Sequence, residues 1–263
     1  MMIIKIGGGR QINLAGITND LATINEPMVI VHGANALRDE LAERLGIPKK
    51  VVTSVSGYTS VFSDSDALDV MMMAYSGLRN KRLVELLQSR GVNAIGLSGL
   101  DGRLIQGQRN RGIRVKEKNK IKLLRDFSGK PKTINKELLN LLLENGYTPV
   151  ITVPIIDETG LAINSENDDI VTLLQSVLQA ELILQLIEAP GFLDDPADPE
   201  SLIKRLSKQE LLRRKQQSTG RMKRKLHALV KLFETGNPRV IIADGRIDHP
   251  IKDALKQKGT VIQ

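Results

Sequence analysis

Lys5 and the glycines that follow it have the composition of an anion-binding turn. The opening segment MMIIKIGGGR places β-branched residues before three consecutive glycines, so we expect a strand that ends at Gly7 and Gly8. Such a turn can offer backbone N–H groups to a phosphate, with a lysine on the preceding strand as the counter-charge. The alternative is a tight bend, with Lys5 reaching solvent at the end of the sheet.

A second segment repeats this arrangement. VIVHGANALRDELAERLG places a predicted strand before Gly33 and Ala34 and an amphipathic helix after them. The start of that helix offers free N–H groups and positive potential, so two such turns at neighbouring strand ends would form one anion pocket. His32 has no second histidine or carboxylate at ligand spacing, and we therefore do not predict a metal site.

Charged residues gather at two predicted helix starts. In INSENDDIVTLL, Asn164 and Asp168 precede a helical run, where a carboxylate could complement the helix start or could orient cations around a phosphate. In GRMKRKLHALVKL, Lys223, Arg224 and Lys225 stand at a helix start, where the helix dipole disfavours cations. Cations at that place indicate an anionic ligand.

These side chains need a scaffold of alternating strands and helices. Near-continuous apolar runs, each followed by a helical pattern, predict an α/β fold with a parallel sheet covered on both faces. The runs are IIKI, MVIVHG, VNAIGL, TPVITVP, LILQLIE and RVIIADG. Three helices are expected to end at a left-handed glycine, namely Gly46, Gly146 and Gly236. Residues 103–130 alternate in short stretches instead, which predicts an inserted antiparallel ribbon.

Composition excludes several classes of site. The chain has 263 residues, enough for one α/β domain or two packed lobes. It has no cysteine and three histidines, which excludes disulfides, thiolate zinc sites and cysteine nucleophiles. No apolar run approaches the roughly 20 residues of a membrane-spanning helix. The first strand begins without a signal-peptide pattern, so we expect a cytoplasmic protein with no membrane partner.

The charge is strongly positive and unevenly spread. The net charge is +8, and residues 109–132 and 213–231 are particularly basic. Such a balance favours nucleic acid, an anionic small molecule or an acidic protein as partner, although both segments could also be solvated faces. Aromatic residues make up only 3% of the chain, which leaves few platforms for stacking bases and argues against nucleic acid.

Taken in order, these motifs resemble the amino acid kinase family, and within it the acetylglutamate kinases. The matching segments are KIGGG, VHGA, INSENDD, EAPGFL and GTVI. GLRNKRLVELLQSRGVNAIGLSGLDGRL, GRMKRK and ADGRIDHPI further resemble the branch that phosphorylates 2-aminoadipate or glutamate held on an acidic amino-group carrier protein. The resemblance implies a three-layer αβα sandwich with a mainly parallel sheet. Residues 1–170 would be a lobe for the acyl substrate and dimerisation, and 171–263 a nucleotide-binding lobe.

The resemblance also implies an activity. We expect transfer of the ATP γ-phosphoryl group to the side-chain carboxylate of an amino-blocked acid, with Mg²⁺ accompanying ATP. The alternative enzyme is an N-acetylglutamate kinase of arginine biosynthesis. Because the first strand begins at once, we expect a homodimer without the N-terminal helix of arginine-inhibited relatives. The basic ribbon would suit docking of the acidic carrier. A nucleic-acid-binding module and a paralogue without activity are the readings from other classes.

Site residues follow from the matched motifs. The resemblance places Lys5 against the transferring phosphoryl group and Lys225 near the β and γ phosphates, with Asp168 holding both lysines. Backbone N–H donors would come from Gly7, Gly8 and Gly33, with Ala34 beside them. Asn164 would contact the acyl substrate, and Glu188 and Gly191 would border ATP.

Three positions depart from the family pattern. Ala34 replaces a glycine, and its methyl group would restrict the approach of a phosphate. Val61 stands where acetylglutamate kinases carry an arginine that grips the substrate α-carboxylate, which puts the identity of the acid in doubt. Arg79 and Arg10 are the candidates to replace that arginine. Glu188 stands where many relatives have aspartate, a smaller change.

Overall fold

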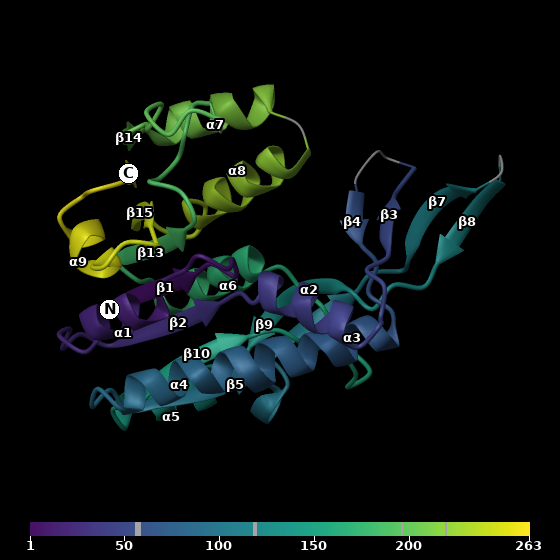
Figure 1. Cartoon of the computed structure of the whole chain (residues 1–263), viewed down its shortest axis with the longest axis horizontal. Coiled ribbons are helices and arrows are strands. Elements are labelled where there is room, and N and C mark those ends of the chain that lie inside the picture. Colours follow the sequence, from purple (N-terminus) through teal and green to yellow (C-terminus); the bar gives the residue numbers. More distant parts are fainter. Residues whose placement is uncertain (56–58, 118–119, 196, 219) are drawn as a thin grey trace.

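An eight-stranded sheet forms the centre of the molecule (Figure 1). The structure, a computed structural model, describes residues 1–263 except 56–58, 118–119, 196 and 219. The strand order is β14-β16-β15-β13-β1-β2-β10-β5, and among the described strands of this sheet only β15 and β16 pair antiparallel. The strands are β1 (Met2–Ile6), β2 (Met28–His32), β5 (Ala94–Ser98), β10 (Thr148–Thr152), β13 (Leu182–Ile187), β14 (Arg205–Leu206), β15 (Arg239–Asp244) and β16 (Thr260–Ile262).

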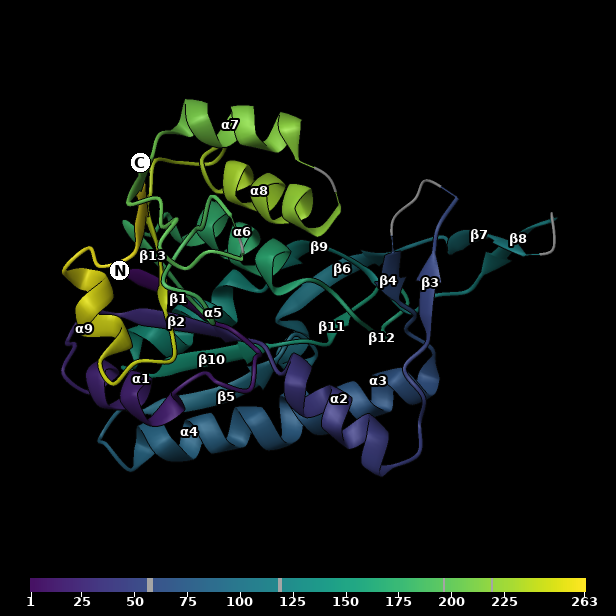
Figure 2. The ribbon, with the colours of Figure 1, turned by 45° about the horizontal axis from the view of Figure 1, so that its top comes forward.

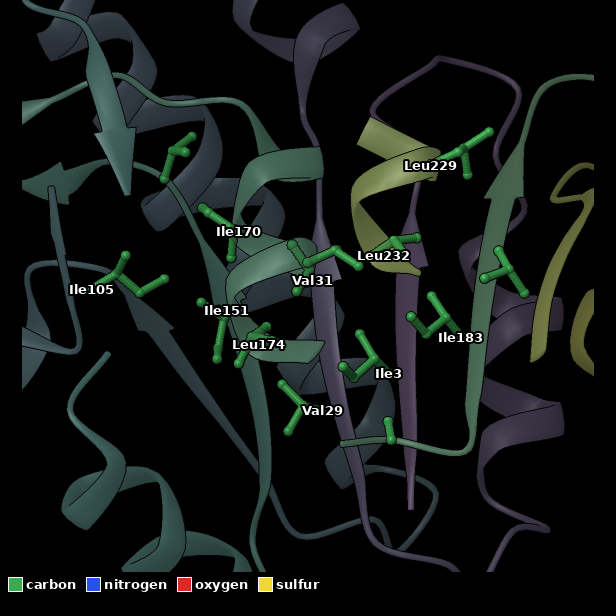
Figure 3. Packing of buried hydrophobic residues seen from close by; sticks show 14 of the residues in the cluster. Ile3, Val29, Val31, Ile105, Ile151, Ile170, Leu174, Ile183, Leu229 and Leu232 are labelled. Atoms are coloured by element: carbon green, nitrogen blue, oxygen red, sulfur yellow. The ribbon is translucent and has the colours of Figure 1, made fainter. Parts of the chain in front are cut away.

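Helices cover both faces of the sheet, as the continuous apolar runs predict. On one face, Ile3 and Val31 pack against Ile170, Leu229 and other buried residues (Figure 3). This face carries α5 (Lys136–Glu144), α6 (Asn167–Leu178) and α8 (Gly220–Leu232), with α7 (Lys208–Gln217) on α8. The opposite face carries α1 (Leu14–Leu21), α4 (Asn80–Gln88) and α9 (Pro250–Leu255). The predicted three-layer sandwich with a mainly parallel sheet is confirmed.

The inserted ribbon is confirmed and is larger than predicted. Its outer part is a hairpin of β7 (Ile113–Glu117) and β8 (Lys120–Leu124), and residues 118–119 between them lie outside the described residues. Its base, β6 (Ile105–Arg109) and β9 (Gly129–Ile134), joins β11 (Ile155–Ile156) and β12 (Ala162–Ile163) in a second sheet. A further hairpin of β3 (Val51–Thr53) and β4 (Thr59–Val61) projects beside β7 and β8 (Figure 2).

One helical segment joins the hairpin region to the main sheet. The chain runs from α2 (Asn35–Arg44) through β3 and β4 to α3 (Ser65–Met71). A π-helical turn, Met72–Arg79, then leads directly into α4. π-Helical segments are rare and often occur near functional sites. The hydroxyl of Ser76 in this segment donates to the carbonyl oxygen of Val153 at 3.0 Å, which ties it to the end of β10.

Two of the three predicted glycine caps are confirmed. Gly46 and Gly146 have φ values of +66° and +75°, so each follows its helix in the left-handed conformation. The prediction for Gly236 is wrong, because its φ is not positive. α8 ends at Leu232, so Gly236 lies in the following loop rather than at the helix end, where it faces the Gln179 side chain.

The predicted boundary near residue 170 stays a prediction. β1 pairs with β2 on one side and β13 on the other, so the central sheet continues through both proposed lobes.

Within the described part of the chain, no helix is both long and apolar enough to cross a bilayer.

Candidate active site

The two glycine turns lie side by side at the carboxyl ends of the neighbouring strands β1 and β2. β1 and β2 are parallel neighbours with Ile6 opposite His32, so the turns that follow them meet. A Cβ atom on Gly8 would lie 2.6 Å from the backbone nitrogens of both Ala34 and Asn35. No side chain fits at that distance, so glycine is required for the turns to pack together. The predicted juxtaposition of the two turns is present.

The supply of free N–H groups differs from the prediction. Gly7 N–H donates to the carbonyl oxygen of Leu186 at 2.9 Å, and Gly33 N–H donates to that of Ile6 at 2.9 Å. These two amides are used to extend the sheet and are not available to a ligand, which corrects their predicted role as donors. None of the described hydrogen bonds uses the N–H groups of Gly8 or Asn35. The N–H of Gly9 is likewise used in none of them, so Gly8 and Asn35 are among the donors that the paired turns leave for an anion.

Lys5 and Asp168, which are 163 residues apart, form an ion pair beside the turns. Lys5 lies in β1, and Asp168 lies in the first turn of α6. The two side chains are 17% and 28% exposed, so the pair is partly shielded from water yet open to a ligand. Asp168 therefore complements the helix start and holds a cation at the same time, while the orientation of that cation towards a phosphate stays a prediction.

Lys225 lies in α8, on the sheet face that also carries α6. Its neighbour Leu226 is buried in the core that includes Ile170, so α8 lies along α6. Lys225 itself is exposed and, among the described residues, has no hydrogen-bond or ion-pair partner. The structure thus brings Lys5 to Asp168, while the predicted contact of Asp168 with Lys225 stays a prediction. The side chain of Arg224 lies outside the described part.

Asn164 lies where the ribbon base meets the β3–β4 hairpin. Its side-chain Nδ2 donates to the hydroxyl of Ser63 at 3.2 Å. Its backbone N–H donates to the carbonyl oxygen of Phe127 at 2.8 Å, next to β9. Asn164 is thereby fixed on the hairpin side of the turns, and its predicted contact with the acid is untested by these bonds.

His32 and Asn167 support the second turn, a role that the sequence reasoning missed for Asn167. Asn167 Nδ2 donates to the carbonyl oxygen of His32 at 3.0 Å, while its Oδ1 is buried and has no hydrogen-bond partner in the described part of the chain. The His32 ring contacts Asn80 Nδ2 through Nε2 at 3.1 Å. Burial lowers the pKa of His32 from 6.5 to about 3, so the ring is neutral. Asn167 stands directly before Asp168 in INSENDD, and this position is the sequence signal that could have identified it.

Glu188 supports the first turn. Its Oε1 accepts a hydrogen bond from the N–H of Gln11 at 2.5 Å. A Cβ atom on Gly9 would lie 1.9 Å from Oε2, so the carboxylate rests directly on that glycine. Gly191 packs more remotely, with a Cβ position 2.7 Å from Thr260 Oγ1. A contact of Glu188 or Gly191 with ATP stays a prediction.

Neither predicted substitute for the missing arginine lines the small cavity that Val61 lines. Arg10 is 79% exposed and pairs with Glu40 at 3.7 Å. Arg79 is partly buried, and its Nε and Nη2 have no hydrogen-bond partner among the described residues. Burial lowers the pKa of the Arg79 guanidinium, and the charge of Glu188 opposes this shift. Arg38, which the sequence reasoning did not single out, lines a small cavity together with Val61.

The assembled site can bind and stabilise a multiply charged anion. The carboxyl ends of β1 and β2 bring together backbone N–H donors, the Lys5 amine and the positive end of α2. Ligands of open α/β sheets commonly bind at the carboxyl ends of the strands. The site therefore suits a reaction in which negative charge on oxygen atoms of the transition state must be stabilised.

Comparisons with known proteins agree with this chemistry. Residues 1–244 match the amino acid kinase family. A "[LysW]-aminoadipate kinase" of Thermus thermophilus is 40% identical, and the match covers 100% of both chains. An "Acetylglutamate kinase" of Methanopyrus kandleri is 31% identical, again over 100% of both chains. The crystal structure of smu.665 from Streptococcus mutans has a TM-score of 0.74 at 20% identity, covering 100% of this chain and 98% of that one.

Proposed function

Because this chain belongs to the amino acid kinase family, we propose that it transfers the γ-phosphoryl group of ATP to a side-chain carboxylate of an amino-blocked acidic amino acid. The acid is 2-aminoadipate or glutamate, linked to an acidic carrier protein. The observation that carries this proposal is the Lys5–Asp168 ion pair beside the paired glycine turns. It supplies an oriented cation next to free backbone donors.

The reaction needs electrostatic stabilisation rather than a general base. A carboxylate, with an ordinary pKa near 4, is already ionised at neutral pH and attacks the γ-phosphorus directly. A carboxylate–phosphorus bond forms, the bond from the γ-phosphorus to the β–γ bridging oxygen breaks, and ADP leaves with the electron pair. Carboxylate and triphosphate repel each other, and negative charge spreads over the transferring oxygens. Preorganised cations and N–H groups lower that barrier.

Each residue has a defined place in this proposal. Lys5 lies against the transferring phosphoryl group, held by Asp168. The N–H groups of Gly8 and Asn35 donate to its oxygens. Lys225, which has no partner among the described residues, approaches the β and γ phosphates from α8.

The described residues fit a metal that arrives with its nucleotide. Asp168 is engaged by Lys5, and the described part of the chain holds no group of three acidic, histidine or cysteine residues suited to a metal ion. Mg²⁺ would be bound mainly by phosphate oxygens and water, as is usual for this ion with ATP, and it supplies charge neutralisation. Glu188 and Gly191 would lie on the nucleotide side.

A carrier-linked acid is favoured by the projecting hairpin. β7 and β8 carry exposed basic residues together with Ile121 and Leu123, which are 66% and 59% exposed. An acidic protein would be attracted to this surface at long range, and its apolar contacts would hold the complex. The Thermus relative's name carries LysW, which supports a carrier as partner. A homodimer and a cytoplasmic location are further expectations from the family likeness.

An N-acetylglutamate kinase is the second candidate, favoured by the Methanopyrus relative. The two are distinguished by trapping the acyl phosphate with hydroxylamine in the presence of ATP and Mg²⁺. We expect hydroxamate from carrier-linked 2-aminoadipate or glutamate at a far lower substrate concentration than from free N-acetylglutamate. Efficient use of free N-acetylglutamate alone would support the second candidate, and no hydroxamate with any acid would contradict both.

A further inference from the structure

Val61 leaves the acid side of the site without the arginine of the family pattern. Val61 ends β4, two residues before Ser63, whose hydroxyl accepts the hydrogen bond from Asn164. A small cavity at the foot of the β3–β4 hairpin is lined by Val61 and by Arg38 of α2. Figure 2 shows α2 and α3 at the foot of this hairpin. Resting on the proposed function, we propose that Arg38 binds the carboxylate of the acid that is not phosphorylated.

Arg38 is paired in a way that allows it to change partner. Its Nε and Nη2 both donate to a single oxygen of Asp39, at 2.9 and 2.6 Å. The other oxygen of Asp39 accepts a hydrogen bond from Lys49 Nζ at 2.8 Å. Burial acts to raise the pKa of Asp39, but the hydrogen bonds from Lys49 and Arg38 hold it below its ordinary value. Because Lys49 alone can neutralise Asp39, Arg38 can turn to a ligand without leaving that carboxylate unpaired.

The position of Arg38 connects the cavity to the second glycine turn. Its side chain is 17% exposed. Burial raises the pKa of the Tyr75 hydroxyl, and the charge of Arg38 acts to lower it. That hydroxyl donates to Oδ1 of Asn35, the first residue of α2. Asn35 and Arg38 are about one helical turn apart, or roughly 5 Å along the axis. An extended acidic amino acid can therefore hold one carboxylate at the turn and the other at Arg38.

The chemistry of the guanidinium fits this role. Its planar fork can donate two parallel hydrogen bonds to one carboxylate, which a lysine cannot do. Valine at position 61 is short, so a guanidinium approaching from α2 is not displaced by a longer side chain from β4. The placement makes Arg38 a specificity-determining residue that recognises the second carboxylate.

Paired substrates test this assignment directly. Carrier-linked 2-aminoadipate and carrier-linked 5-aminopentanoate share the reacting carboxylate, but the second acid lacks the carboxylate beside the nitrogen. For Arg38→Met we expect KM for the 2-aminoadipate form to rise about 10- to 100-fold, the range of a lost hydrogen-bonded charge pair. KM for ATP and for the 5-aminopentanoate form should stay within twofold of wild type. Arg38→Lys should fall between Met and wild type.

Two further variants separate recognition from folding. Arg44→Met is the matched control, because Arg44 lies on the same helix, is 70% exposed and pairs with Glu40 instead. It should leave both KM values unchanged. Adding Val61→Arg to Arg38→Met should restore most of the lost affinity for 2-aminoadipate.

Three results would overturn the assignment. Arg38→Met could leave KM unchanged, or it could impair both acids equally, which would show a structural role. Failure of Val61→Arg to recover the affinity that Arg38→Met loses would show that the two positions do not serve the same carboxylate. Absence of phosphorylation of either acid by the wild-type enzyme would instead overturn the proposed function, and this assignment with it.

Discussion

The glycine turns and the hairpin side of the molecule are built differently, one from backbone atoms and the other from side chains. At the turns, backbone atoms of two parallel strands pack so closely that only glycine fits at position 8, and one ion pair fixes the nearby amine. On the hairpin side, the residues proposed to bind the acid are side chains such as Arg38 and Asn164, which lie on separate elements. If the proposed function holds, phosphate binding depends on the backbone of the fold, whereas the choice of acid depends on side chains that can be exchanged.

Loss of the amine at the turns should have the largest effect. Lys5→Ala removes the cation proposed to lie against the transferring phosphoryl group, so we expect kcat to fall about 100- to 1,000-fold, as for loss of one oxyanion donor. Lys225→Ala should fall in the same range. Steady-state kinetics measures both, with Lys256→Ala as a control, because Lys256 is exposed at the end of α9 and away from the turns. Near-normal turnover of either variant would remove that lysine from the site.

Crowding the turns should come next. Gly8→Ala places a methyl group 2.6 Å from two backbone nitrogens, so the turns must separate and kcat should fall by about tenfold or more. The melting temperature should also drop. Gly77→Ala is the matched control, because the nearest atom to its Cβ position is 3.5 Å away. Equal behaviour of the two variants would contradict the close packing of the turns.

Charge reversal on the hairpin should have a smaller and selective effect. Lys116 and Lys120 are exposed on β7 and β8. In the double variant Lys116→Glu/Lys120→Glu we expect KM for the carrier-linked acid to rise several-fold, with KM for ATP unchanged. In the wild type, the same KM should increase with salt, because charges at the surface are screened over about 8 Å at physiological ionic strength. A salt-independent KM would argue against docking through this surface.

The smallest effect concerns stability rather than activity. The pKa of His32 is about 3 in the folded chain, against an ordinary value of 6.5. The unfolded state therefore binds a proton that the folded state does not, and His32 should lower stability as the pH falls from 6.5 towards 3. This contribution changes by at most about 1.4 kcal/mol per pH unit. Urea unfolding should show a weaker pH dependence for His32→Gln, and an unchanged slope would contradict the buried neutral ring.

The sequence is informative about the fold because the strands are buried on both faces. Continuous apolar runs and the glycines after them predict the parallel sheet and the meeting of the two turns. The bonding of Gly7 and Gly33 could not be predicted, because whether an amide extends a sheet depends on the register of its neighbours. The prediction of a glycine cap at Gly236 was wrong because α8 ends at Leu232, four residues earlier, and the sequence pattern does not fix where a helix ends.

Side chains that meet across separate elements were the least predictable part of the site. Lys5 and Asp168 could be paired only through the family resemblance, because 163 residues separate them. Arg38 looks like one more charge on an amphipathic helix, and only the cavity that it shares with Val61 reveals its position. The missing arginine at Val61 was visible in the sequence, but Arg38 becomes a candidate to replace it only through the cavity that both residues line.

A structure with ADP, Mg²⁺, aluminium fluoride and the acid substrate tests the convergence of the two lysines most directly. The fluoride plane mimics the phosphoryl group in transfer. We predict that the Nζ atoms of Lys5 and Lys225 both lie within hydrogen-bond reach of the bound mimic and ADP, about 2.7–3.2 Å, with Asp168 still contacting Lys5. A bound mimic with either amine directed into solvent would contradict the account.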